Sequence, residues 1–86
     1  MTSEPFVRLE LRNLRRGDVA KPLRAERGGV ADGDSVRGEG WVVRFVDGES
    51  AQVGRLRVPV LFVEVEGPMA AEIARFLRLQ TMRGGG

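Results

Sequence analysis

The chain has 86 residues, of which 42% are hydrophobic and 30% charged, and its formal net charge is +2. This length suits one domain with a small core, and the composition is typical of globular rather than disordered proteins. Because the sequence has no His and no Cys, it cannot build the usual zinc, iron–sulfur or haem ligand sets, nor a catalytic triad that uses His. We therefore expect one non-enzymatic domain over residues 1–86, with flexible ends at 1–4 and 83–86 and neither a metal nor a cofactor.

No segment of the sequence resembles a signal for export or for membrane insertion. The longest apolar run, Val58–Val63, is much shorter than the roughly 20 residues that a membrane-spanning helix needs. Residues 1–5 lack the basic and apolar regions of a signal peptide. Together with the absence of cysteine, these features predict a cytoplasmic protein without a membrane partner.

Basic and acidic residues are mixed along the chain. In Arg8, Glu10 and Arg12, for example, both signs fall on the same side of one predicted strand. Such mixing is typical of cross-strand ion pairs on a solvated face, whereas nucleic-acid binding needs a clustered basic stripe. The sequence therefore predicts no nucleic-acid partner.

The first half of the chain contains one clear element. Phe6–Arg12 alternates strictly between apolar and charged residues, which predicts a half-buried strand. Asp18 is a candidate cap for a short helix, with Pro22 tolerated only in its first turn. Residues 28–40 hold five glycines and predict the main loop, with a short strand near residues 35–37.

The second half is more regular. Trp41–Val46 predicts a strand, and Asp47-Gly48 predicts a hairpin turn after it. Ala51–Arg57 then returns, and Val58–Glu66 forms a further strand with Pro59 at an edge or a bulge.

A helix is expected from about Pro68 to Met82, because the apolar period changes from 2 to 3.6 residues at Gly67. Pro is favoured in the first position of a helix, and Gly84 is a natural stop. We expect this helix to pack across an antiparallel sheet of four or five strands; the residues that make the contact are Ile73, Phe76 and Leu77.

Four segments resemble a known family. They are Val42–Phe45, Val53–Pro59, Val63–Gly67 and the terminal Arg83–Gly86. Over residues 40–86 the chain is similar to the C-terminal domain of proteins related to the small subunit of molybdopterin synthase (MoaD-related proteins) of Thermus-type bacteria. The resemblance implies an α+β fold with the TATA-binding-protein-like (TBP-like) order β-α-β(4)-α and helices on one face of the sheet. In that family the domain follows a sulfur-carrier domain; here we expect a stand-alone domain, so we do not expect sulfur transfer to come with the resemblance.

Three functions remain open. The first is a protein-interaction module, a homodimer or the binder of another protein, because two short helices can cover only one face of the sheet. The second is a carrier that uses its terminal glycines as a thiocarboxylate or conjugation site, and the third is small-molecule binding between sheet and helix. The candidate interface residues are Val46, Val58, Val60 and Phe62, and the candidate carrier tail is Gly84, Gly85 and Gly86.

Overall fold

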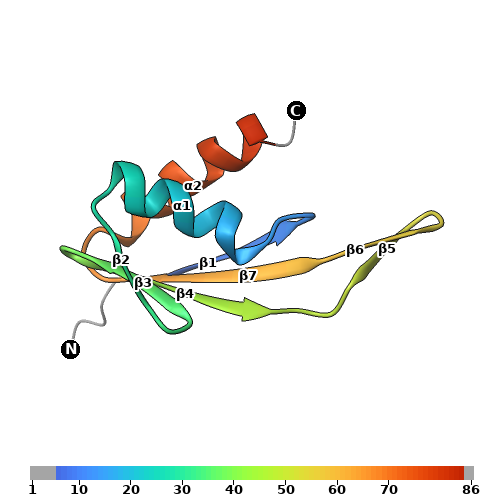
Figure 1. The fold of residues 1–86 in the computed structure, drawn as a ribbon, viewed down its shortest axis with the longest axis horizontal. Coiled ribbons are helices and arrows are strands. Elements are labelled where there is room, and N and C mark those ends of the chain that lie inside the picture. Colours follow the sequence, from blue (N-terminus) through green and yellow to red (C-terminus); the bar gives the residue numbers. More distant parts are fainter. Residues whose placement is uncertain (1–5, 85–86) are drawn as a thin grey trace.

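The computed structural model describes residues 6–84, and these form an α+β domain. Five antiparallel strands make one sheet in the order β1-β7-β4-β3-β2, and β5 pairs with β6 in a separate two-stranded ribbon. Both helices lie on the same side of the five-stranded sheet (Figure 1). The elements in chain order are β1 (Phe6–Arg12), α1 (Arg16–Glu26), β2 (Val30–Asp32), β3 (Ser35–Gly38), β4 (Trp41–Asp47), β5 (Ala51–Val53), β6 (Leu56–Val58), β7 (Val60–Glu66) and α2 (Ala70–Gly84). The expected class and strand number are confirmed.

The core lies between the sheet and the helices. Alternate residues of the long strands point toward the helices, as the period-2 pattern predicts. On α2, Ile73 and Leu77 are buried and Phe76 packs against the core from a half-buried position, so the predicted contact face of this helix is confirmed. The buried strand residues are Leu9, Leu11, Val36, Trp41, Val43, Phe45, Leu61, Val63 and Val65.

Helix α1 begins earlier than the sequence predicts. Asp18 stands in its first turn rather than before it, and its carboxylate accepts the backbone N–H of Arg15 at 2.9 Å. Pro22 consequently lies inside the helix, where its missing N–H removes one backbone hydrogen bond. The helix is retained because Val19 and Leu23 bury their side chains in the core, and tertiary packing outweighs weak propensity.

The glycine-rich segment is mostly a hairpin rather than a loop; the short strand predicted near residues 35–37 is confirmed as β3. Strands β2 and β3 pair around Gly33, which has a φ of +59°. Two other glycines make room for the indole of Trp41: a Cβ on Gly29 or Gly38 would lie 2.9 or 2.2 Å from ring atoms. Two of the five glycines that predict a loop, Gly29 and Gly38, thus leave space for the side chain of Trp41.

The predicted turn at Asp47-Gly48 is wrong. The chain continues from β4 into β5, turns at Gly54-Arg55, and returns through β6 into β7 as one long hairpin. Between the paired positions Asp47↔Leu61 and Ala51↔Val58, residues 48–50 oppose only residues 59–60. The extra residue interrupts the ladder like a bulge, and Pro59, which has no N–H, lies at this interruption as expected.

The junction between β7 and α2 is tightly packed. Gly67 has a φ of +112°, and the next residues turn before the helix begins at Ala70, two residues after the predicted start at Pro68. The backbone N–H of Met69 donates to the carbonyl of Gly40 at 2.9 Å. This bond joins the start of α2 to the turn between β3 and β4.

Candidate interaction surface

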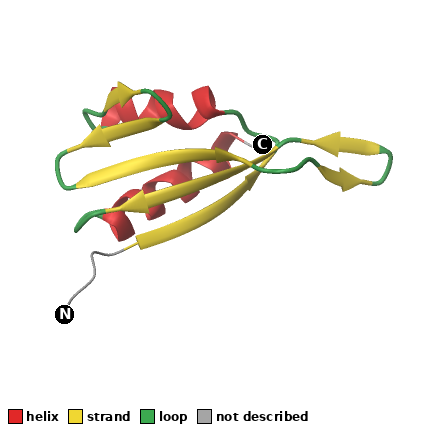
Figure 2. Ribbon diagram, turned by 90° about the horizontal axis from the view of Figure 1, so that it is seen from below, coloured by secondary structure: helices red, strands yellow, loops and turns green. Residues whose placement is uncertain are grey.

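The side of the sheet opposite the helices, here called the open face, has no cover among residues 6–84 (Figure 2). Its central strands carry the cross-strand pair Val46↔Phe62. Val46 is 39% exposed and Phe62 is half-buried. Two of the predicted interface residues are therefore neighbours on an accessible surface.

The other two predicted interface residues occupy different positions. Val60 is only 8% exposed, and Gly48 lies against its side chain. Val58 is half-buried and belongs to the β5–β6 ribbon rather than to the main sheet. Val60 thus offers little surface for a contact, and Val58 offers surface on a separate element.

Charged side chains narrow the apolar part of the open face. The guanidinium of Arg8 lies over the ring of Phe62, 4.3 Å from its centroid, and also approaches Glu64 at 3.9 Å. The shortest ion pair on this face is between Arg12 and Glu10, at 3.1 Å. Arg8 and Glu64 form a cross-strand pair of the kind that the sequence predicts, whereas Arg12 and Glu10 both belong to β1. The sequence does not predict that an arginine covers part of Phe62.

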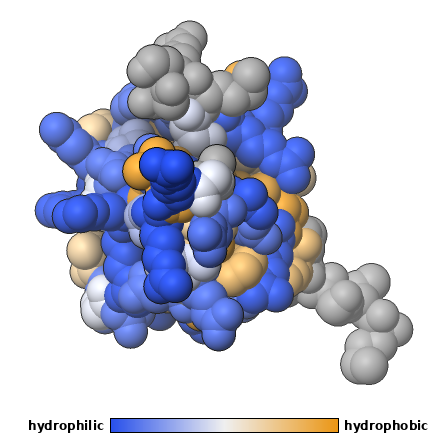
Figure 3. Space-filling model, turned by 90° about the vertical axis from the view of Figure 1, so that its right-hand side faces the viewer, coloured by the Kyte–Doolittle hydropathy of each residue, from blue (hydrophilic) through white to orange (hydrophobic). Residues whose placement is uncertain are grey.

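The β5–β6 ribbon, here called the arm, projects beyond the five-stranded sheet (Figures 1 and 2). It helps to make the molecule elongated, with extents of 45, 31 and 23 Å. Leu56 near its tip is 69% exposed, and it stands between Arg55 and Arg57. Seen from this end, hydrophilic side chains dominate the surface and apolar ones gather mainly on one flank (Figure 3).

A shallow hollow of about 430 Å³ lies where the arm leaves the open face. Val60 and Phe62 provide its apolar part, and the end of β1 and the bulged segment provide its polar rim. The residues around it are Glu10, Arg12, Glu49, Ser50, Ala51, Val60 and Phe62. The hollow depends on the bulge at residues 48–50. Sequence reasoning missed it because it predicted a hairpin turn at Asp47-Gly48 in place of this bulge.

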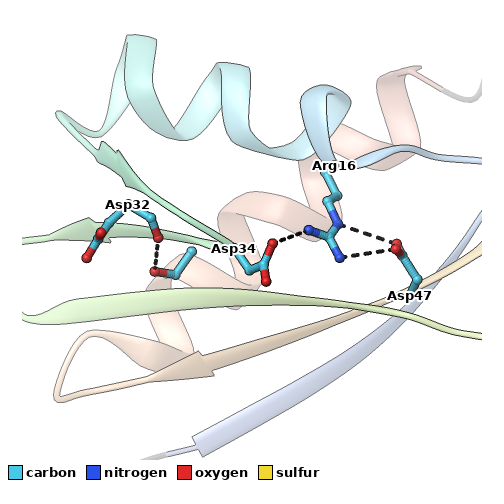
Figure 4. A network of polar contacts seen from close by, with 5 residues as sticks. Arg16, Asp32, Asp34 and Asp47 are labelled. Atoms are coloured by element: carbon cyan, nitrogen blue, oxygen red, sulfur yellow. Dashed lines mark hydrogen bonds and ion pairs between the residues drawn. The ribbon is translucent and has the colours of Figure 1, made fainter.

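A polar network at the same end of the sheet ties α1 to the turn between β2 and β3 and to the end of β4 (Figure 4). The guanidinium of Arg16 donates to Asp34 at 2.6 Å and to Asp47 at 3.1 and 3.4 Å. The hydrogen bond to Asp34, followed by that to Asp47, raises the pKa of Arg16 above its ordinary value. All three side chains are exposed. Because the guanidinium of Arg16 stays charged and paired, it positions the start of α1 rather than transferring protons.

The space between sheet and helices is occupied by side chains. Val63, Ile73 and Leu77, which face one another across it, are each at most 1% exposed.

Within residues 6–84, no three acidic side chains approach closely enough to hold a metal ion. Neither described helix is both long and apolar enough to cross a membrane.

The terminal glycines are described only in part. Gly84 is the last residue of α2, so the helix extends past the predicted end at Met82. Gly85 and Gly86 lie outside the described residues, as do residues 1–5. The carrier hypothesis therefore gains no geometric support from the part of the chain that the structure describes.

Comparison with known proteins gives no further assignment. No model of a known protein family matches the sequence, and no curated protein matches it either.

Proposed function

We propose that this domain is a non-enzymatic protein-interaction module that binds a second copy of itself through the open face. The observation that carries the proposal is the pair Val46 and Phe62, which lies on the two strands β4 and β7, near the end from which the arm projects, on a sheet face that neither helix covers. Apolar side chains in such a position gain free energy when another surface removes them from water.

We further propose a TBP-like arrangement for the fold. If the arm is counted as an extension of β4 and β7, the remaining elements follow the order β-α-β(4)-α. This order agrees with the resemblance to the C-terminal domains of MoaD-related proteins over residues 40–86. The resemblance points to molybdenum-cofactor or sulfur-carrier pathways as the setting, and the absence of cysteine from the sequence favours the cytoplasm as the location.

The substitution Phe62→Glu tests the proposed contact. We expect the unmodified protein to be a dimer at high micromolar concentration and the variant to be a folded monomer, because the contact would have to remove a carboxylate from water, which is costly even with Arg8 beside it. Light scattering gives the mass, and circular dichroism shows whether the variant is folded. The variant should fold because Phe62 is outside the core cluster.

Leu79→Glu provides a matched control. Leu79 is also an exposed apolar residue, at 54%, but it lies on α2 in the helical layer. The proposal predicts that this variant remains dimeric. An unmodified protein that is monomeric at high micromolar concentration would rule the proposal out, and so would a Phe62→Glu variant that dimerises as well as the unmodified protein.

A further inference from the structure

An apolar strip continues from the open face onto the arm. Phe62 and Ala51 both line the hollow, and Ala51 is paired with Val58 across the arm. Leu56 lies two residues before Val58, and therefore points to the same side of the ribbon. A ribbon of only two short strands is marginally stable in water. The apolar side of the arm therefore gains stability from contact with another surface.

The charges of the arm tip and the hollow are complementary. Among the described residues, neither Arg55 nor Arg57 forms an ion pair. The rim of the hollow carries Glu10 and Glu49 against the single cation of Arg12. A tip with the unpaired Arg55 beside an exposed leucine thus fits a hollow whose apolar side chains are bordered by two carboxylates and one guanidinium, with only Glu10 already paired, to Arg12.

The tip cannot reach the hollow of its own chain. Leu56 and Phe62 lie on the same extended return segment of the long hairpin, and six residues of extended chain span about 20 Å. A second copy removes this restriction. If two copies cross with their arms antiparallel, a two-fold axis midway between tip and hollow brings each tip to the hollow of the other copy.

We propose that two copies associate about such an axis, with Leu56 of each copy in the hollow of the other and Arg55 beside Glu10. The inference rests on the proposed self-association and adds to it the element and the residues that determine which surfaces meet. The arm is then a dimerisation element rather than an unused extension of the sheet.

Charge reversal at the two ends of this contact tests the inference. Arg55→Glu should weaken self-association at least about tenfold, because it places two carboxylates together at each of two equivalent contacts. Glu10→Arg should weaken it in the same way by placing two guanidinium groups together. An equimolar mixture of the two variants should associate as tightly as the unmodified protein, because both contacts of the mixed dimer then join opposite charges. Sedimentation equilibrium measures the dissociation constants of the unmodified protein, of each variant and of the mixture.

Arg57→Glu is the control, since Arg57 lies within β6, where alternation points it away from the side of Leu56, whereas Arg55 lies in the turn before the strand and is not bound by this alternation. The dissociation constant of Arg57→Glu should change less than about threefold. If the unmodified protein dimerises but Arg55→Glu does not weaken the dimer, or the mixture fails to restore it, the arm contact is wrong while the open-face proposal stands. If the unmodified protein is monomeric, both proposals are wrong.

Discussion

Replacing Leu77 with alanine is expected to lower the free energy of unfolding by about 2–5 kcal/mol. Leu77 is fully buried between α2 and the sheet, so the substitution removes apolar contacts and leaves a cavity. A chain of this length has a total stability of about 4–13 kcal/mol, so the loss is a large share of it. The corresponding fall in Tm is roughly 10–30 °C.

Leu79→Ala is the matched control, because the same side chain is shortened two residues further along the same helix. Leu79 is 54% exposed, and we expect a change of no more than about 0.5 kcal/mol. Urea unfolding followed by the fluorescence of Trp41 measures both variants, since this buried residue is the one tryptophan. Equal losses for the two variants would mean that α2 presents a different face to the sheet.

The second large fall in the free energy of unfolding is expected for Gly67→Ala. At a φ of +112°, a residue with a Cβ costs about 1–3 kcal/mol from its backbone conformation alone. The added methyl would also lie 2.5 Å from the carbonyl oxygen of Gly40 and 3.1 Å from the Cα of Trp41. Backbone atoms cannot move aside as a flexible side chain can. We therefore expect the free energy of unfolding to fall by more than the roughly 1–3 kcal/mol that the backbone conformation alone costs.

Gly17→Ala adds the same methyl group where the structure leaves space for it. Gly17 is in the first turn of α1, and no atom would lie within 4 Å of its Cβ. Alanine loses less backbone entropy than glycine when the helix folds. We therefore expect Gly17→Ala to raise the free energy of unfolding by up to about 1 kcal/mol. Thermal unfolding of both variants checks the signs. A neutral Gly67→Ala would contradict the close approach of the β7–α2 junction to Gly40.

The sequence predicts the long strands and the second helix because their burial pattern repeats at a fixed period. The β1 pattern is confirmed by the buried Leu9 and Leu11, and the α2 pattern is confirmed by Ile73 and Leu77. The same alternation correctly separates Val46 and Phe62 from the core face. These predictions depend only on local periodicity, which the sequence carries directly.

The remaining features depend on contacts between distant residues. The β2–β3 hairpin has few apolar residues, and its neighbouring glycines are needed for the packing of Trp41. The arm and the hollow arise because β4 and β7 stay paired past Asp47, although Asp-Gly is the stronger local turn signal. The position of Arg8 over Phe62 depends on a side-chain conformation across two strands. No pattern within one segment predicts these arrangements.

The most direct test of the open-face contact is a dilution series followed by the backbone amide signals in NMR spectra. The account predicts that the signals of Val46, Phe62 and Leu56 shift with protein concentration, while those of Arg75 and Arg78 in the helical layer stay in place. Concentration-dependent shifts confined to α2, or no shifts up to high micromolar concentration, would contradict it.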